Sequence, residues 1–353
     1  MEKTWDVIIA GAGIIGVSLA LELHDRGAQV LVLDRGEPGR EASPAAAGML
    51  APADPETNVL LRPLAFASAQ MYPGFVQKLE DASGVQVDFR RQGTISFLPA
   101  SDPPPLYRKL SPEELYRLEP AVQPPSDTPY FVQEDSVDPR LLMQAALAAA
   151  PSRGISICGN AEVAEMRRCG EHVEVVAGGT LHRARAAVNC RGAWAGRPVR
   201  PRKGQMLSLR PRKMDLLQHS IIAHDVYFVP RSSGRILVGA TVEDAGYDRT
   251  VEPHVVQKLH HAAAQLVPEL GDLPVEESWA GLRPGSPDDL PLLGETETRG
   301  VFIAAGHFRN GILLAPLTAR IIADLITGKP AATDISAFSP ARFAAASSAS
   351  SGS

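Results

Sequence analysis

The strongest constraint on the fold is a glycine-rich turn close to the start of the chain. Val7–Ala10 is a short apolar run typical of a buried strand. The run ends at the sequence GAGIIG, residues 11–16, after which apolar residues recur at helical spacing. A second apolar strand, Gln29–Leu33, follows and ends on Asp34. This order of strand, glycine turn, helix, strand and acid predicts a dinucleotide-binding unit.

Each part of this motif has a mechanical role. Gly11 takes the tight turn, Gly13 lets the backbone approach a pyrophosphate, and Gly16 lets the helix pack against the strand. The free N–H groups at the helix N-terminus attract the phosphates. The Asp34 carboxylate is placed to accept hydrogen bonds from an adenosine ribose. The motif itself does not distinguish FAD from NAD.

The composition predicts a soluble protein of two domains. A chain of 353 residues exceeds one ordinary core, and 44% hydrophobic with 21% charged residues is typical of globular proteins. The net charge of −5 offers no general attraction to nucleic acid or anionic lipid. The first apolar run is far too short to span a membrane. Three widely spaced cysteines without a C-x-x-C pattern predict reduced thiols of a cytoplasmic protein, with neither disulfides nor a metal site.

The character of the sequence changes twice further along the chain. Residues 42–52 are almost all small, and they form either a flexible connector or a backbone that a flat ring system approaches closely. Residues 63–139 depart from the α/β pattern of the start. That pattern returns with a helix at Pro139–Ala150 and a strand, 184–190, that leads into a glycine turn before Trp194. We therefore predict that the dinucleotide-binding domain is discontinuous.

A β-hairpin is predicted around Tyr227. Apolar strands flank Ser232-Ser233, and a two-residue loop there would pair Tyr227 with Val238. Because side chains alternate along a strand, Tyr227 and Val242 would then share one face of the sheet.

A second strand–glycine loop–helix unit lies near the C-terminus. The strand 301–306 is followed by the loop 307–311 and a long helix that ends at Gly328. Pro316 is tolerable in this helix only within the first turn, where N–H groups lack partners. The unit therefore aims another helix N-terminus at a ligand.

Taken together, these stretches resemble the glycine oxidase branch of the D-amino-acid oxidase family of flavoproteins. The resemblance is most specific at residues 46–52 (AAGMLAP), 279–285 (WAGLRPG) and 306–316 (GHFRNGILLAP). It implies an α/β fold with a discontinuous, Rossmann-like FAD-binding domain and a substrate domain built on a mixed or antiparallel sheet. No cysteine lies in 306–316, so the FAD is expected to be non-covalent.

The resemblance also implies domain boundaries and cofactor contacts. The FAD-binding domain comprises residues 1–62, 140–204 and 281–340, the substrate-binding domain comprises 63–139 and 205–280, and 341–353 form a disordered tail. Arg191 departs from the family pattern, in which a small residue is usual at its position. The cofactor-binding residues come from the two glycine loops, the small-residue segment and the strands beside them: Gly11, Gly13, Ile14, Ile15, Gly16, Asp34, Arg35, Ser43, Ala46, Ala47, Gly48, Met49, Val163, Trp194, Gly306, His307, Arg309, Asn310, Gly311 and Ile312.

The substrate contacts implied by the resemblance centre on two residues. Arg283 and Tyr227 match positions that grip the substrate carboxylate, and Arg309 reaches both the pocket and the flavin. Val242 stands where glycine oxidases carry a bulkier methionine, so substrates larger than glycine are expected to fit. The remaining pocket candidates are Met49, Ala51, Val242 and His224.

The residue types support oxidation of an amino acid by hydride transfer. The planar fork of Arg283 and the Tyr227 hydroxyl would hold the carboxylate and fix the α carbon near flavin N5. A neutral amine then expels the hydride, so no side-chain base is needed, with His224 and His307 as alternative bases. The helix after Asn310 would stabilise the negative charge of the reduced flavin. Oxygen would reoxidise the flavin to give hydrogen peroxide, and the imine would hydrolyse to keto acid and ammonia.

The expected enzyme is an FAD-dependent oxidase of glycine, sarcosine, another N-alkylglycine or a D-amino acid. Its expected partners are that substrate and O2, its implied pathway is thiamine biosynthesis, and a homo-oligomer is left open. The alternatives are a D-amino-acid dehydrogenase that reduces a quinone, an NAD(P)-dependent dehydrogenase and a non-catalytic FAD-binding subunit. The second glycine loop argues against a nicotinamide enzyme, which has no need of a second helix aimed at the ring.

Overall fold

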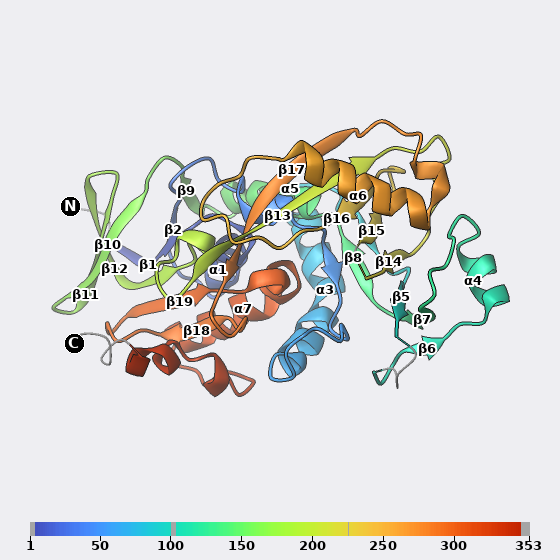
Figure 1. The fold of residues 1–353 in the computed structure, drawn as a ribbon. Coiled ribbons are helices and arrows are strands. Elements are labelled where there is room, and N and C mark those ends of the chain that lie inside the picture. The colour runs from blue at the N-terminus through green and yellow to red at the C-terminus, as the bar shows by residue number, and fades with distance from the viewer. Residues whose placement is uncertain (1–3, 100–103, 225, 347–353) are drawn as a thin grey trace, which may run out of the picture.

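The chain folds into two large mixed sheets and one small sheet, which confirms the expected α/β class. The structure is a computed structural model and describes residues 4–99, 104–224 and 226–346. Figure 1 shows the first sheet at the end of the molecule that holds both termini, and the second sheet toward the other end.

The first sheet is built around strand β1 (Thr4–Ala10). Strand β1 pairs in parallel with β2 (Val30–Leu33) on one side and with β12 (Thr180–Asn189) on the other. Strand β12 also pairs in parallel with β19 (Val301–Ala305), so strands from opposite ends of the sequence lie close together. Both faces of β1 are apolar because both are covered. The other strands of this sheet are β9 (Ser156–Cys158), β10 (Val163–Cys169), β11 (His172–Ala177) and β18 (Leu292–Glu295).

The second sheet has the strand order β17-β13-β16-β15-β14-β5-β7-β6. Its long strands β13 (Arg200–Leu209) and β17 (Glu277–Gly285) form an antiparallel pair. Helix α6 (Pro253–Leu266) packs on one face against Leu207, and the opposite face carries Met206. The remaining strands are β5 (Thr94–Leu98), β6 (Arg108–Lys109), β7 (Thr128–Val132), β14 (Ser220–Ile222), β15 (Tyr227–Pro230) and β16 (Ile236–Gly239), and the small sheet comprises β3 (Met49–Leu50), β4 (Phe89–Arg90) and β8 (Asp135–Val137).

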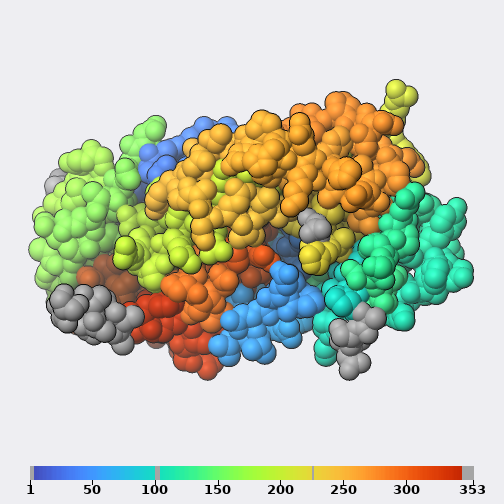
Figure 2. Space-filling view, in the orientation of Figure 1, coloured from blue at the N-terminus to red at the C-terminus, as the bar shows by residue number. Residues whose placement is uncertain are grey.

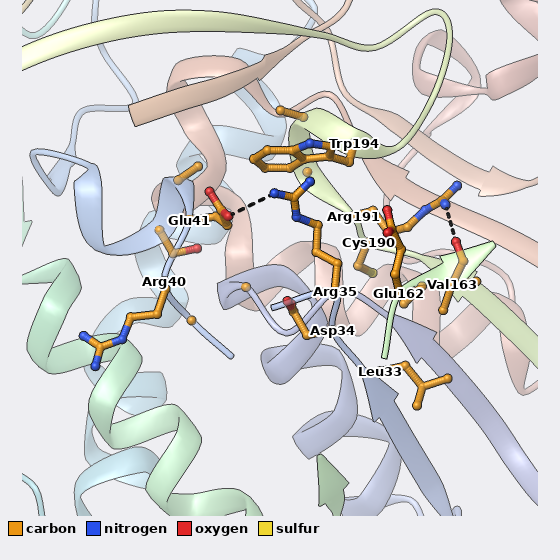
Figure 3. A pocket seen from close by; sticks show the side chains of 18 residues that line it. Leu33, Asp34, Arg35, Arg40, Glu41, Glu162, Val163, Cys190, Arg191 and Trp194 are labelled. Atoms are coloured by element: carbon orange, nitrogen blue, oxygen red, sulfur yellow. Dashed lines mark hydrogen bonds and ion pairs between the residues drawn. The ribbon is translucent and has the colours of Figure 1, made fainter. Parts of the chain in front are cut away.

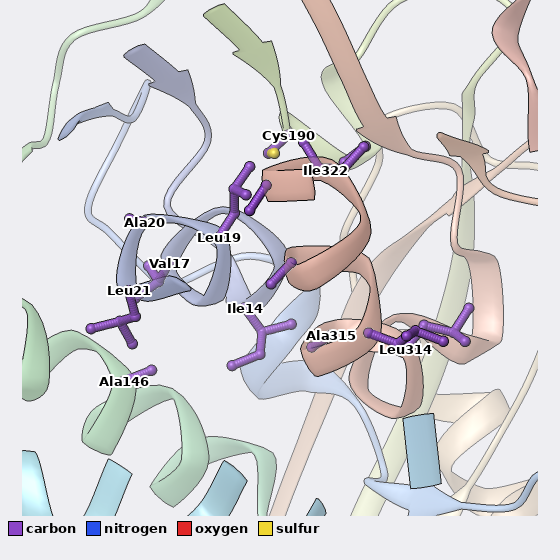
Figure 4. Close-up of a cluster of buried hydrophobic side chains, with 14 of the residues drawn as sticks. Ile14, Val17, Leu19, Ala20, Leu21, Ala146, Cys190, Leu314, Ala315 and Ile322 are labelled. Atoms are coloured by element: carbon purple, nitrogen blue, oxygen red, sulfur yellow. The ribbon is translucent and has the colours of Figure 1, made fainter. Parts of the chain in front are cut away.

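The main core lies between helices α1 (Ile14–Asp25) and α7 (Gly311–Ile326) and the first sheet. Figure 4 shows Ile14 of α1 beside Ala315 of α7, although these helices lie at opposite ends of the sequence. No helix in the described part of the chain has the length and apolar character needed to cross a membrane. The other α-helices are α2 (Ala42–Ala45), α3 (Arg62–Ser83), α4 (Pro112–Leu118) and α5 (Pro139–Ser152).

Helix α7 contains Pro316 beyond its first turn, so the expectation for this proline is wrong. The missing N–H of Pro316 leaves the carbonyl of Ile312 without its helical donor. The Tyr72 hydroxyl of α3 donates to that carbonyl, and the Ser68 hydroxyl donates to the carbonyl of Leu313 at 2.6 Å. Helix α3 thus supplies from outside the hydrogen bond that α7 lacks, and the helix continues past the proline.

The hairpin around Tyr227 also differs from the expected one. Its loop comprises residues 231–235 rather than two residues, and Tyr227 pairs with Gly239 instead of Val238. Strand β16 ends at Gly239, and the chain then continues along β13, where Glu243 forms an isolated β-bridge with Lys203. Val242 therefore lies outside the regular pairing of β15 with β16 and precedes the Glu243 bridge to β13, and it is 38% exposed.

The C-terminal end has more structure than predicted. A 3₁₀ helix over Pro340–Ala346 occupies the first part of the tail that was expected to be disordered from residue 341. Arg342 of this helix forms an ion pair with Asp288 at 2.8 Å, which holds the helix against the first sheet's end of the molecule. Residues 347–353 of the predicted tail lie outside the described residues.

Candidate functional site

The first glycine turn is shaped by close backbone contacts. Gly11 has a φ of +105°, and a Cβ there would lie 2.3 Å from the carbonyl oxygen of Cys190. A Cβ on Gly16 would lie 1.9 Å from the carbonyl oxygen of Gly11, so α1 can approach the turn only with glycine at this position. The N-cap of helix α1 is Gly13, which has no side chain to accept hydrogen bonds from the free N–H groups of the first turn. These N–H groups form an anion-binding end that suits a pyrophosphate.

Two polar side chains hold this turn in place. The Asp34 carboxylate accepts hydrogen bonds from the N–H groups of Ala12 at 2.7 Å and Gly36 at 2.9 Å. The Ser43 hydroxyl oxygen accepts from the N–H of Ile14 at 3.0 Å. The Asp34 carboxylate therefore holds the loop in place, and only its remaining lone pairs can accept hydrogen bonds from a ribose.

A cleft with about 720 Å³ of unfilled space, part of it open to solvent, lies beside this turn. The Arg35 guanidinium lies 3.9 Å from the centre of the Trp194 ring and 3.7 Å from the Glu41 carboxylate, as Figure 3 shows. The cleft is lined by Ala10, Gly11, Gly13, Leu33, Asp34, Arg35, Gly39, Arg40, Glu41, Ala42, Ser43, Glu162, Val163, Cys190, Arg191, Gly192, Ala193 and Trp194.

Arg191 is a cleft residue whose role was not predicted. Its guanidinium donates to the carbonyl of Val163 at 2.9 Å and to the Asn189 side chain at 3.1 Å, which joins two strand ends across the cleft (Figure 3). Burial lowers the pKa of Arg191, and the nearby Glu162 carboxylate opposes that shift. The only signal in the sequence was that arginine replaces the small residue expected there.

The small-residue segment packs tightly against the second sheet. A Cβ on Gly281 of β17 would lie 2.7 Å from the Cβ of Ala45, and the Trp279 indole donates to the Ala45 carbonyl at 3.0 Å. From the other side, the buried Arg231 guanidinium donates to the Ala47 carbonyl, and burial lowers the pKa of Arg231 to about 10. The segment is therefore a fixed surface rather than a flexible connector. Arg231, which sequence reasoning missed, comes from the hairpin loop whose length was misjudged.

The second glycine loop joins the first sheet to β17. Gly306 has a φ of +77° at the end of β19, and His307 forms an isolated β-bridge with Gly285. The His307 ring turns into the core, where its Nε2 lies 3.1 Å from the Thr318 hydroxyl, and burial lowers the pKa of His307 to about 4. His307 is therefore neutral at physiological pH. After the short 3₁₀ turn Phe308–Asn310, helix α7 begins at Gly311, and its second residue, Ile312, is buried in the core.

Arg283 and Tyr227 approach each other over two glycines. The Arg283 guanidinium of β17 crosses β13 where Gly204 has no side chain, because a Cβ there would lie 2.1 Å from its Nη1. The Tyr227 ring of β15 crosses β16 at Gly239, where a Cβ would lie 2.5 Å from the phenol oxygen. Nη1 of Arg283 donates to the Thr241 carbonyl at 3.0 Å. The two side chains thus converge above the seam between β13 and β16.

The charges at this pair favour an anionic ligand. Burial raises the pKa of Tyr227 above its usual value, and the adjacent Arg283 charge opposes that shift. Tyr227 therefore stays protonated at neutral pH and can donate a hydrogen bond. Burial also lowers the pKa of Arg283, while its interaction with Tyr227 opposes the change. Arginine remains charged even so, and its planar fork matches a carboxylate.

The other predicted pocket residues are only partly gathered around this pair. Met49 packs with Tyr227 in one apolar cluster, and Ala51 follows it directly in the chain. The Arg309 side chain is exposed and forms an ion pair with Glu56, yet its charge acts on both Arg283 and Tyr227. His224 lies exposed in the turn after β14. Val242 lies beyond β16, between Thr241 and the Glu243 bridge to β13.

The segment after Ala51 is held by a buried carboxyl that the sequence did not reveal. Glu134, 4% exposed, accepts a hydrogen bond from the N–H of Ala53 at 3.0 Å. Burial raises the pKa of Glu134 to about 8. Its second oxygen and the Tyr107 hydroxyl are buried without a hydrogen-bond partner among the described residues. Glu134 and Tyr107 therefore form a polar cluster beneath the loop in which Glu56 forms its ion pair with Arg309.

Comparisons with known proteins agree on one family. A family model described as FAD dependent oxidoreductase (DAO) matches residues 6–325. The glycine oxidase of Geobacillus kaustophilus is 36% identical over 97% of this chain and 98% of its own length. The crystal structure of glycine oxidase from Geobacillus kaustophilus gives a TM-score of 0.90 at 33% identity and covers 95% of this chain and 98% of that chain. The bifunctional protein ThiO/ThiG of Trichormus variabilis is 35% identical over 96% of this chain, which spans only 55% of that longer relative.

Proposed function

Because the chain belongs to the family of FAD-dependent oxidoreductases, we propose that it is an amino-acid oxidase whose substrate is glycine or a small N-substituted glycine. The observation that carries this proposal is the convergence of Arg283 and Tyr227 over Gly204 and Gly239. A guanidinium beside a protonated phenol, in a partly apolar pocket, suits the carboxylate of an amino acid. The similarity to glycine oxidases supports this choice of substrate.

The residues of the cleft fit the adenosine and pyrophosphate parts of FAD. The cradle at Gly11 and Gly13 admits a diphosphate, and the flat Trp194 ring lines the cleft. We propose that the cleft binds the adenosine half, and that Ala46–Met49 and Arg309–Ile312 hold the flavin half. Bound FAD supplies the hydride acceptor and, on reaction with O2, yields hydrogen peroxide.

The chain's own residues bind and orient the substrate. Arg283 and Tyr227 hold the carboxylate and thereby fix the position of the α carbon. His307 is not placed to act as a base, because its ring faces Thr318 within the core. The N-terminus of α7 contributes a partial positive charge to the flavin-binding loop. The proposed chemistry therefore rests on positioning rather than on a side-chain base.

The nicotinamide alternative is not supported, since the family of this chain uses FAD. An oxidase and a quinone-dependent dehydrogenase differ in the molecule that accepts the electrons from the reduced flavin. We propose O2 as the acceptor.

A substrate panel tests the proposed function. Glycine, sarcosine, N-ethylglycine, D-alanine and D-proline are each incubated with the purified holoprotein while peroxide and oxygen are followed. Peroxide in equal amount to the oxygen consumed, with glycine or an N-alkylglycine among the best substrates, supports the proposal. Reduction of a quinone by these substrates without peroxide would favour the dehydrogenase, and no turnover of any amino acid would refute the substrate class.

The remaining expectations are proposals of the same kind. We propose that residues 1–62, 140–204 and 281–340 bind FAD and that 63–139 and 205–280 bind substrate. Three free cysteines, one of them buried, are consistent with the proposed cytoplasmic location. The oxidation would supply a glycine-derived imine, which fits the proposed place in thiamine biosynthesis. Gel filtration at several concentrations tests the proposed homo-oligomer.

A further inference from the structure

A fully buried lysine lies in β13, next to the glycine that admits Arg283. The Lys203 side chain is 0% exposed, and its Nζ lies 3.2 Å from Asp248, 3.6 Å from Glu252 and 3.8 Å from Glu243. All three carboxylates belong to one segment, residues 241–252, which we call the strap. A buried ammonium is tolerated only when it is paired in this way.

Gln205 binds the same segment from the same face of β13. Its side-chain amide donates to both carboxylate oxygens of Glu243 at 3.0 and 3.2 Å, and its side-chain oxygen accepts from the N–H of Glu252 at 2.7 Å. Residues 203 and 205 continue the strand face on which Leu207 packs against α6. Two polar residues thus replace the apolar pattern where the strap covers this face.

The two parts of the strap reach the two halves of the proposed active site. At the start, the Thr241 carbonyl accepts the hydrogen bond from Arg283. Further along, the Tyr247 ring stacks on Trp194 at 5.5 Å, and its hydroxyl donates to the Ala193 carbonyl at 3.3 Å. Arg249 then pairs with Glu41 of the cleft at 2.8 Å.

The strap lies on the surface of the molecule. In Figure 1 the chain between β16 and α6 runs out toward the first sheet before it returns to α6. In Figure 2 the golden atoms near residue 250 cover the middle of this face, beside the yellow-green atoms near residue 200. Besides the side chains of Lys203 and Gln205, β13 holds the strap through an ion pair of Arg202 with Asp244 at 3.3 Å and a backbone bridge between Lys203 and Glu243.

We propose that Lys203 is a positioning residue that fixes the strap between the dinucleotide cleft and Arg283, and thereby couples the retention of FAD to the affinity for the substrate carboxylate. The inference rests on the proposed function for the identity of the two ligands. Tyr247 supports the outer face of Trp194, which lines the cleft, and Thr241 orients the guanidinium. A single rigid segment that contacts both sites transmits a change at one to the other, and such coupling is reciprocal.

The test is the substitution Lys203→Met in the full-length holoprotein, with Lys258→Met as the matched control. Lys258 is an exposed residue of α6 and lies outside the strap. We expect Lys203→Met to increase the rate of FAD release on dilution, followed by flavin fluorescence, on the order of tenfold. With saturating FAD, we expect KM for glycine to rise by a similar factor while kcat changes little. Lys203→Arg keeps the charge and should restore part of both effects.

Two further variants keep the proposal testable if Lys203→Met does not fold. Asp248→Asn removes the nearest, half-exposed partner of Lys203 and should reproduce both effects more weakly. Tyr247→Ala should accelerate FAD release and leave KM for glycine nearly unchanged, because Thr241 remains anchored by Gln205.

The proposal is overturned if Lys203→Met or Asp248→Asn lowers only the thermal stability while FAD release and KM keep their wild-type values. It is also overturned if Lys203→Met or Asp248→Asn changes the rate of FAD release and leaves KM for glycine unchanged. A protein that binds FAD but oxidises none of the amino acids refutes the proposed function instead, since FAD release still reports on the strap.

Discussion

An alanine at position 204 would place a carbon atom where the Arg283 guanidinium now lies. The added Cβ would be 2.1 Å from Nη1, 2.5 Å from Cζ and 2.6 Å from Nη2 of Arg283. Non-bonded heavy atoms settle at about 3.5 Å, so the guanidinium must retreat by roughly 1 Å or more. Its hydrogen bond to the Thr241 carbonyl, 3.0 Å long, would be lost or redirected in the process.

The expected loss follows from this displacement. A misplacement of about 1 Å in a binding group lowers catalytic efficiency by on the order of 10²-fold, which corresponds to about 2.7 kcal/mol. Because Arg283 is proposed to hold the substrate and does not line the dinucleotide cleft, we expect Gly204→Ala to keep its bound FAD. Most of the loss should lie in KM, since the guanidinium holds the carboxylate before and during the reaction.

The assay measures kcat and KM for glycine by peroxide release, with flavin absorbance as the measure of bound FAD. Gly74→Ala is the control, because Gly74 is exposed in α3 and a Cβ there meets nothing within 4 Å. That change should raise the free energy of unfolding by about 0.5–1 kcal/mol and leave activity unchanged. A Gly204→Ala enzyme with kcat/KM within a few-fold of wild type would refute the assignment of the carboxylate site to Arg283.

Four other outcomes are expected. Arg283→Ala should lower kcat/KM by raising the activation free energy about 2–5 kcal/mol. The variant should keep its FAD, and Arg283→Lys should not restore the activity. Tyr72→Phe leaves the Ile312 carbonyl beside Pro316 without a hydrogen bond and should lower the free energy of unfolding by about 1–3 kcal/mol. Urea unfolding measures this loss, with the exposed Tyr116→Phe as the control. Equal unfolding midpoints for the two variants would contradict the role of α3. Burial raises the pKa of Glu134 to about 8 in the folded state, whereas the pKa in the unfolded chain is about 4.5. As the pH rises through that window, the wild type should therefore lose stability relative to Glu134→Gln. Parallel curves of stability against pH for the two proteins would show that Glu134 is not protonated in the fold. The purified protein should be yellow and release free FAD on acid denaturation, whereas flavin that stays with the precipitate would mean a covalent link.

The first glycine turn could be predicted because its constraint is local. Gly11 and Gly16 are demanded by contacts within a single strand–turn–helix unit, and the flanking apolar periods identify that unit in the sequence. Arg283 and Tyr227 were identified by resemblance. The reason they converge lies in Gly204 and Gly239, two strand glycines that look unremarkable until the neighbouring strands are known.

The hairpin register could not be read from the residues. A two-residue loop at Ser232-Ser233 satisfies the local pattern, but Arg231 turns inward to the Ala47 carbonyl and lengthens the loop. That contact joins residues far apart in sequence. The same holds for Pro316, whose carbonyl partner is supplied by Tyr72 of another helix.

One feature of the sequence indicates that a segment such as the strap covers β13. Lys203 and Gln205 are polar at positions where the strand face should be apolar, and a lysine that cannot reach solvent must have partners elsewhere. Sequence reasoning did not use this feature, because the burial of a strand end depends on what crosses it.

The packing of α1 against α7 determines when the fold can be completed during synthesis of the chain. About 300 residues separate the end of α1 from the end of α7. At the usual rate of protein synthesis this interval takes roughly 15 to 60 s, during which the apolar face of α1 has no α7 to cover it. Strand β19 and the second glycine loop are made equally late. The two glycine loops can therefore come together only after α7 has been made, and until then the part of α1 that α7 covers stays open to aggregation.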